Sequence, residues 1–139
     1  MNKWVQVFDI ELLEIIRNQG VGELQVGAPE DRMLAILGEP ELPVVRLSKK
    51  SPIFQRNYEN MTILTENEYV IAIDINFEND QLEGIILGEA GQYRISEWMD
   101  FAQQHGWTVT KIVDVVQLGK DRVMISLSLE GKIMMVSLR

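Results

Sequence analysis

Residues 69–78 read Tyr-Val-Ile-Ala-Ile-Asp-Ile-Asn-Phe-Glu, and this stretch decides the fold. Its odd positions are all apolar or aromatic, whereas Asp74, Asn76 and Glu78 occupy the even positions of its second half. Successive side chains of a β-strand point to opposite faces, so this period of two predicts a strand with one buried face. We therefore expect Ile73 to be buried and Asp74 to lie on the other, partly exposed face.

Two further strands are predicted beside this one. Residues 61–65 precede it across Glu66-Asn67-Glu68, and residues 82–87 follow it across Asn79-Asp80-Gln81. Both connections are short and rich in turn-forming residues, which indicates an antiparallel meander.

A second run of strands is predicted over residues 107–116, 122–129 and 132–138. Alternation in the middle segment predicts that Ile125 is buried and that Ser126 is at least partly exposed. Glu130-Gly131 stands where a tight hairpin turn is needed, and glycine tolerates the positive φ of such a turn.

Helices are predicted over residues 9–19 and 29–37, and from about residue 96 to residue 105, because apolar residues recur there at helical spacing. The residues that favour the starts are Asp9, Pro29 and Ser96, and those that favour the ends are Gly20, Gly38 and Gly106. Prolines interrupt residues 39–57, which predicts an extended loop with at most a short strand at residues 43–47.

The predicted order is therefore two helices, three strands, one helix and three strands. We expect a single domain over residues 1–139, of the α+β class, with one antiparallel sheet of five or six strands and about three helices packed mainly on one face. The repeat of a helix and a meander is compatible with an internal duplication.

Charge is unevenly distributed along the chain. The formal net charge is −8, and residues 58–91 hold eight acidic residues and no lysine or arginine. Such a chain is repelled by phosphate backbones, so nucleic acid is not an expected partner. Two interpretations stay open: the acids form a solvated face, or they attract a basic protein partner. On the second interpretation the partner-binding residues are Glu66, Glu68, Glu78, Asp80 and Glu83.

Several kinds of chemistry are disfavoured. The chain has no cysteine and one histidine, His105, which falls at the predicted end of the third helix and suits a capping role there. The series Asp74, Asn76, Glu78, Asp80 departs from a calcium loop, because Asn79 replaces the required glycine and Ile85 the final glutamate. We therefore assign no catalytic, cofactor-binding or metal-binding residue, and we expect neither a cofactor nor enzymatic activity.

The residue pattern also predicts where the protein works. The first residues lack the apolar core of a secretory signal, and no segment approaches the roughly 18 apolar residues of a membrane span. We expect a cytoplasmic protein that does not bind membranes. The tryptophans that flank the third helix, Trp98 and Trp107, are expected in the core.

One segment resembles known families. Residues 24–40 show a hydrophobic residue followed by Gly27, a short helix, and Leu37-Gly38-Glu39-Pro40 before the strands. This pattern is similar to the small-protein-A/OmlA lipoprotein family, to β-lactamase-inhibitor-like folds and to small bacterial immunity proteins of toxin systems. The resemblance implies a helix pair packed on an antiparallel sheet and a role in protein binding without catalysis. The chain lacks a lipobox cysteine, which argues against a lipoprotein.

Three functions follow as hypotheses. The first is an immunity protein that neutralises a cognate bacterial toxin, with an acidic surface complementing a basic active cleft. The alternative is an acidic chaperone for a secreted effector, which an apolar groove and dimerisation would favour. The third is a small enzyme or ligand-binding domain, which a deep polar pocket would favour.

Overall fold

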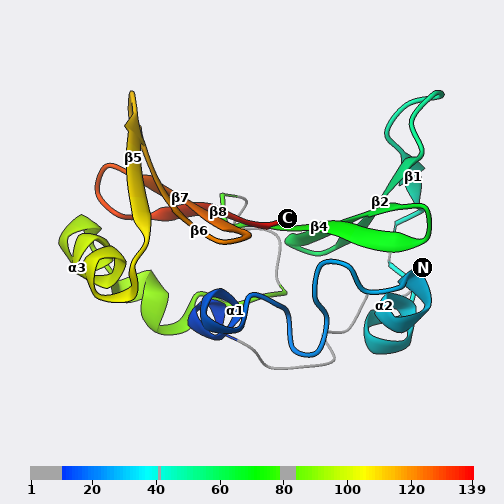
Figure 1. Ribbon diagram of the computed structural model, residues 1–139, viewed down its shortest axis with the longest axis horizontal. Helices are drawn as coiled ribbons and strands as arrows, with labels where there is room; N and C mark the ends of the chain where they lie inside the picture. The colour runs from blue at the N-terminus through cyan, green and yellow to red at the C-terminus, as the bar shows by residue number, and fades with distance from the viewer. Residues whose placement is uncertain (1–10, 41, 79–83) are drawn as a thin grey trace.

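The computed structural model describes residues 11–40, 42–78 and 84–139, and these form one antiparallel sheet with helices on one side of it (Figure 1). The sheet has eight strands, and three α-helices accompany it. The expected α+β class with a single antiparallel sheet is therefore confirmed. The strands are β1 (Val45–Arg46), β2 (Ile53–Tyr58), β3 (Met61–Glu66), β4 (Tyr69–Asn76), β5 (Thr108–Ile112), β6 (Val115–Lys120), β7 (Val123–Ser128) and β8 (Ile133–Leu138).

The strand order across the sheet is β1-β2-β3-β4-β8-β7-β6-β5. Two four-stranded meanders, β1–β4 and β5–β8, are thus joined through their last strands. Four residue pairs make this junction, from Ile73 opposite Leu138 to Asn76 opposite Met135. The helices α1 and α2 precede the first meander in the chain, and α3 precedes the second.

The helices begin and end close to the predicted positions. They are α1 (Leu12–Asn18), α2 (Glu30–Leu37), α3 (Ile95–His105) and the short 3-10 helix η1 (Gly88–Gln92). Pro29 is the residue before α2, and the glycines at 38 and 106 follow α2 and α3 with φ of 79° and 73°. Left-handed backbone of this kind favours glycine, which explains these two ends. Gln19 rather than Gly20 ends α1, and Asp9 lies outside the described residues.

The expectation of five or six strands is wrong, for two reasons. Residues 53–57 were expected in a loop but belong to β2, because Pro52 precedes the strand and leaves its hydrogen bonds intact. Residues 107–116 were expected as one strand but form parts of β5 and β6, because the chain turns at Val113, whose φ is 52°.

The expectation of a strand over residues 82–87 is also wrong for residues 84–87, the part of this segment that the structure describes. These residues belong to none of the eight strands and run beside α1 instead. The Leu12 amide donates a hydrogen bond to the Ile86 carbonyl at 3.0 Å. The buried side chain of Asn60 holds them from the sheet side. Its Nδ2 donates to the Ile85 carbonyl at 2.9 Å, and its Oδ1 accepts from the Ile85 amide at 3.0 Å.

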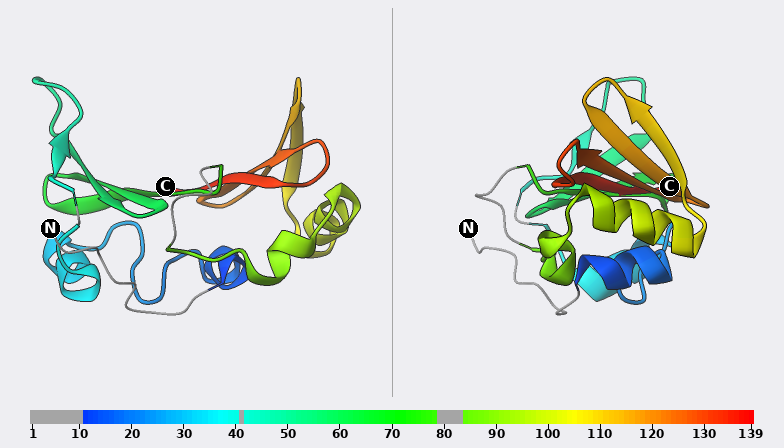
Figure 2. Two further views of the ribbon diagram at one scale, coloured as in Figure 1. Left: turned by 180° about the vertical axis from the view of Figure 1, so that it is seen from behind. Right: turned by 90° about the vertical axis from the view of Figure 1, so that its left-hand side faces the viewer.

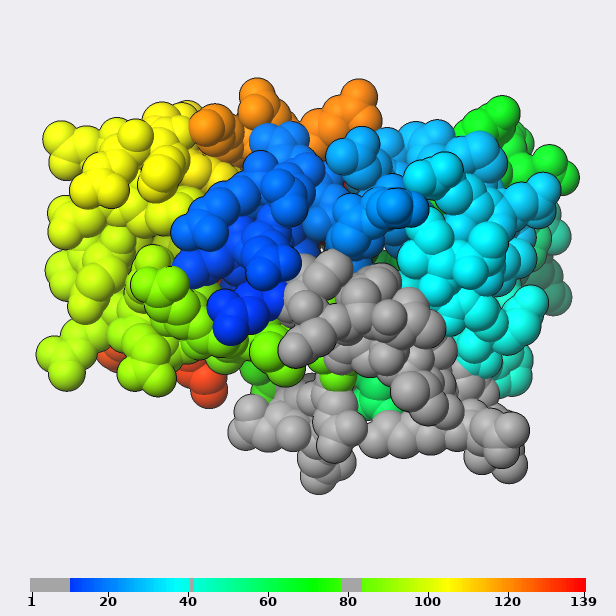
Figure 3. All heavy atoms as spheres, turned by 90° about the horizontal axis from the view of Figure 1, so that it is seen from below, coloured from blue at the N-terminus to red at the C-terminus, as the bar shows by residue number. Residues whose placement is uncertain are grey.

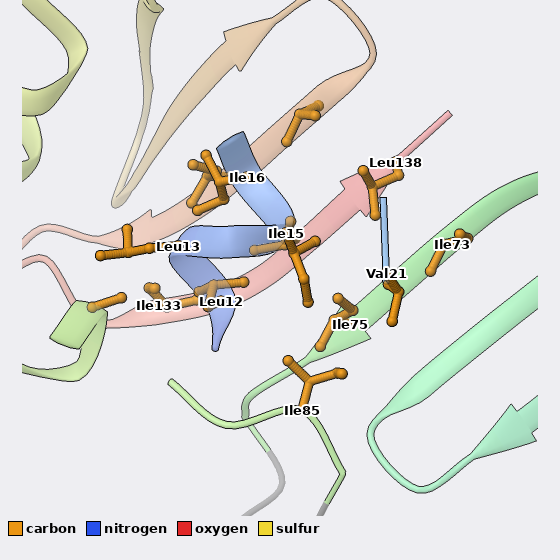
Figure 4. Close-up of a cluster of buried hydrophobic side chains, with 14 of the residues drawn as sticks. Leu12, Leu13, Ile15, Ile16, Val21, Ile73, Ile75, Ile85, Ile133 and Leu138 are labelled. Carbon is orange, nitrogen blue, oxygen red and sulfur yellow. The ribbon is translucent and has the colours of Figure 1, made fainter. Parts of the chain in front are cut away.

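The core lies between the helices and the sheet. Apolar side chains of α1 pack over the junction of β4 and β8 (Figure 4). Ile73 and Ile125 are fully buried, whereas Asp74 and Ser126 are half-buried, as predicted. At the start of β4 the predicted alternation is wrong, because the pairing with β3 shifts between Leu64 and Thr65, which leaves Tyr69 exposed and buries Val70. Trp98 and Trp107 are buried as expected.

All three α-helices lie on the same side of the sheet (Figure 1). Seen from below, α1 and the chain after it lie between α2 and α3 (Figure 3). The opposite side of the sheet carries none of the described helices, as the view from behind also shows (Figure 2).

Candidate functional site

The sheet surface that faces away from the helices is the candidate site, and we call it the open face. On β7, Val123, Ile125 and Leu127 are buried toward the helices, so Met124 and Ser126 point to the other side. Residues that lie directly opposite each other on paired strands share a face, so the strand pairings show which residues of the other strands also lie on this side. The open face comprises Val45, Ile53, Gln55, Asn57, Thr62, Leu64, Glu66, Tyr69, Ala72, Asp74, Asn76, Thr108, Thr110, Ile112, Val115, Gln117, Gly119, Met124, Ser126, Ser128, Met135 and Ser137.

The open face is concave along the row of strands. The β1–β2 hairpin rises at one end and the β5–β6 hairpin at the other, with the flatter β4 and β8 between them (Figure 1). The view from behind shows the same two raised hairpins (Figure 2). A body placed on this face would contact a floor and two side walls.

The open face carries little charge. Charged residues make up 24% of the chain, but among the described residues of this face they are Glu66 and Asp74. Asp74 Oδ2 accepts a bond from Arg139 Nη2 at 3.3 Å, which offsets its charge. Serine, threonine, asparagine, glutamine and methionine dominate instead. Depletion of charge with enrichment of methionine is typical of the centre of protein interfaces.

The polar side chains of the open face are partly ordered by one another. Gln55 Nε2 donates to Asn57 Oδ1 at 3.1 Å, and the Thr62 hydroxyl donates to the same oxygen at 3.0 Å. The first bond lies within β2, and the second links β2 to β3 across the face. Side chains that are already oriented lose less conformational entropy when a partner binds.

The five predicted partner-binding acids do not form one patch in the described structure. Glu66 ends β3 on the open face, and Glu68 is exposed in the following turn. Glu78 is exposed just beyond the other end of β4. Asp80 and Glu83 lie outside the described residues. An eight-residue strand such as β4 is about 26 Å long, so Glu68 and Glu78 are separate contact points at most.

Glu68 borders a shallow acidic hollow at the α2 end of the molecule. The hollow has a volume of about 350 Å³ and is lined by Pro29, Glu30, Asp31, Glu68 and Tyr69. Glu30 is already engaged, because its Oε1 binds Arg56 Nη2 on β2. This pair positions α2 against the sheet.

A basic hollow lies at the opposite end of the open face, and the sequence analysis missed it. It has a volume of about 610 Å³, and its charged lining residues are Lys120, Asp121, Arg122 and Arg139. The sequence places Arg139 far from the other three. They meet because β8 returns along β7, where the Arg139 amide bonds the Arg122 carbonyl at 2.9 Å.

His105 lies in the last turn of α3, at the predicted end of this helix. Its own carbonyl accepts a hydrogen bond from Lys120 Nζ at 2.7 Å, and its ring packs on Phe101 with centroids 4.8 Å apart. Within the described ranges, no three histidine, cysteine or carboxylate side chains gather as a metal site would require. The part of the chain that the structure describes also has no helix long and apolar enough to cross a membrane.

No protein-family model, no curated protein and no solved structure matches this chain. Its function is therefore inferred from its own surface.

Proposed function

We propose that this chain is a non-catalytic protein-binding module that neutralises a cognate bacterial toxin, with the open face as its contact surface. The observation that carries the proposal is the concave, charge-poor sheet surface on the side opposite the described helices. Strands are about 4.8 Å apart and six residues span about 20 Å, so eight strands offer roughly 700 Å². A stable protein interface buries roughly 800 Å² on each partner, which is close to this area.

The chemistry of the open face favours a protein over other partners. Its hydroxyl and amide groups donate and accept hydrogen bonds, and Met124 and Met135 add exposed apolar contact at 39% and 37% exposure. A net charge of −8 works against a polyphosphate backbone. The face is polar rather than a continuous apolar groove, which favours a toxin-neutralising protein over a chaperone for an effector.

The acidic turn at Glu66 and Glu68 has a supporting role in this proposal. It stands at one end of the open face and would draw a basic region of the toxin toward that end. Steering of this kind raises the association rate, while the neutral floor supplies the packed contact. The partner is thus expected to be basic where it meets β3.

The test uses a toxin candidate encoded beside this protein's gene, expressed under an inducible promoter. Wild-type protein should protect the cells and bind the purified toxin in calorimetry. Ser126→Arg with Met135→Arg places two charges at the centre of the open face, where these residues are directly opposite each other. This variant should lose protection and weaken binding at least a hundredfold, because both charges would be buried without partners.

The matched control is Gln103→Arg with Gln104→Arg, which adds the same charge on the exposed surface of α3. It should protect as well as wild type. Circular dichroism of both variants checks that the sheet is intact. If the open-face variant binds the toxin with wild-type affinity, the contact surface lies elsewhere and the proposal fails.

A further inference from the structure

The basic hollow is a positively charged region on a protein whose net charge is negative. Three cationic side chains, Lys120, Arg122 and Arg139, border it, against one carboxylate, Asp121. Asp121 is held at its rim, where its Oδ2 accepts a bond from Gln19 Nε2 at 3.1 Å. A chain with net charge −8 therefore presents a concave positive surface at the β5–β7 end of its open face.

The positive charges are only partly offset by their neighbours. Lys120 Nζ donates to the neutral carbonyl of His105, so its charge is not compensated by that bond. Arg139 shares the carboxylate of Asp74 at 3.3 Å, but its side chain stays 57% exposed. Arg122 is exposed in the turn between β6 and β7. These groups retain donors for an incoming anion.

Neutral donors and empty space complete the hollow. Thr108 and Thr110 of β5 and Gln117 of β6 line it from the strands. Gly119 lies directly opposite Thr108, and a Cβ added there would meet Met124 Cε at 3.7 Å, an ordinary contact. Glycine thus leaves room on the strand surface that a larger side chain would fill without straining the backbone.

We propose that the basic hollow binds an acidic segment of the protein partner, one or two carboxylates inserted between the β5–β6 wall and Arg122. Arginine, lysine and hydroxyl donors around a concave surface fit carboxylate oxygens. The inference rests on the proposed function, because it describes the partner's chemistry at one end of the open face. With the acidic turn of Glu66 and Glu68 at the opposite end, it would also determine which way round the partner binds.

The test needs no native partner. Isotope-labelled protein is titrated at low ionic strength with a tetraglutamate peptide blocked at both ends, and amide shifts are followed by NMR. We expect saturable shifts at Thr108, Thr110, Gln117 and Gly119. Arg122→Glu should weaken the affinity at least tenfold, since it replaces a charge-assisted bond by repulsion. Gly119→Val should weaken it similarly by filling the hollow.

The matched control reverses charge at the far end of the same face. Lys49→Glu with Lys50→Glu alters the exposed loop between β1 and β2 and should leave peptide affinity within twofold of wild type. Parallel titrations with inorganic phosphate and with a short oligothymidylate test the other anions. Both should bind more weakly than the peptide, because a single phosphate reaches fewer of the donors at once, and because none of the described residues that line the hollow is an aromatic on which the bases of the oligothymidylate could stack.

Three outcomes would overturn the inference: no saturable shift with the peptide, shifts centred away from the hollow, or tighter binding of the oligothymidylate. The peptide result is independent of toxin protection. If the peptide does not bind while Ser126→Arg with Met135→Arg still abolishes toxin binding, the inference about the hollow is wrong and the proposed function stands. If the peptide binds but that variant still protects, the open face is not the toxin contact, and the anion site then requires another partner.

Discussion

A buried arginine on β2, Arg56, connects α2 to the sheet. Arg56 is 8% exposed on the helix side of β2, where Nη2 binds Glu30 and Nη1 donates to the Thr65 hydroxyl at 3.1 Å. Glu30→Ala should lower the free energy of unfolding by about 3 kcal/mol, because the guanidinium would stay buried without its counter-charge. Urea unfolding measures this loss.

The control for that substitution is an exposed ion pair between Arg32 of α2 and Glu23, which lies in the turn region before that helix. Glu23 and Arg32 approach to 3.6 Å with side chains 83% and 55% exposed. Glu23→Ala should change stability by less than about 0.5 kcal/mol. Equal losses from both substitutions would contradict the role given to Arg56.

Tyr58 predicts how stability depends on alkaline pH. Its ring is fully buried and its hydroxyl donates to the Gly38 carbonyl at 2.8 Å. Burial raises the pKa of the phenol to about 12, with Glu39 and Glu30 adding to the rise and Arg56 opposing it. The unfolded phenol has a pKa of about 10, so the neutral form favours the folded state.

This stabilisation should be complete below pH 10 and should be lost as pH rises from 10 to 12, by about 3 kcal/mol in total. Tyr58→Phe should cost about 1 kcal/mol near neutral pH and should flatten the alkaline loss. Urea midpoints from pH 8 to pH 12 test both effects. Tyr69→Phe, at an exposed ring, is the control, and a curve of unchanged shape in Tyr58→Phe would contradict the assignment.

At the scale of elements, the β7–β8 turn fits closely against the start of α3. Gly131 has φ of 99°, and a Cβ there would lie 2.4 Å from the Ile95 amide nitrogen. Its carbonyl accepts the indole bond of Trp98 at 3.1 Å. Gly131→Ala should therefore destabilise the protein by more than about 2 kcal/mol, since left-handed backbone alone costs roughly 1–2 kcal/mol.

Gly119→Ala provides the comparison, because its φ is ordinary and its added Cβ meets only a methionine side chain at 3.7 Å. That change should stay within about 0.5 kcal/mol of wild type. Thermal unfolding of the two variants separates them, and similar midpoints would show that the turn does not press on α3.

The strands that sequence alone predicts are those whose alternation is purely apolar against polar. β7 and the second half of β4 satisfy this rule, and Ile73, Ile75, Ile125 and Leu127 are buried as predicted. In the first half of β4 the prediction is wrong, because the pairing with β3 shifts there, so that Val70 is buried and Tyr69 is 54% exposed. β2 does not satisfy the rule, because Arg56 occupies a buried position and is neutralised by Glu30, 26 residues earlier. A local pattern holds no information about such a distant partner. For the same reason the basic hollow was missed, since Arg139 meets Arg122 only through the pairing of β8 with β7.

At the scale of the whole molecule, the acidic turns predict a salt-dependent association with the toxin partner. Glu66→Lys with Glu68→Lys should slow association and reduce its dependence on ionic strength. The reason is that the Debye length falls from about 10 Å at 0.1 M to about 3 Å at 1 M salt. Stopped-flow rates at several salt concentrations measure both quantities.

Glu78→Lys tests the other end of β4 separately. If both variants associate at the wild-type rate, the acids are a solvated surface and the partner's basic character loses its support. A loss confined to Glu66 and Glu68 would place the basic region of the partner over β3.

The junction of β4 and β8 also has a consequence for biosynthesis. β4 leaves the ribosome well before β8, and at roughly 5–20 residues per second the chain between Asn76 and Ile133 takes several seconds to translate. During that time β4 of the nascent chain has one unpaired edge, with Ile73 and Ile75 along it. Such an edge invites pairing with other newly made chains. Asp74 lies on the same stretch, and its counter-charge, Arg139, is translated after β8. Until then the free carboxylate of Asp74 is the feature that discourages a foreign strand from adding there.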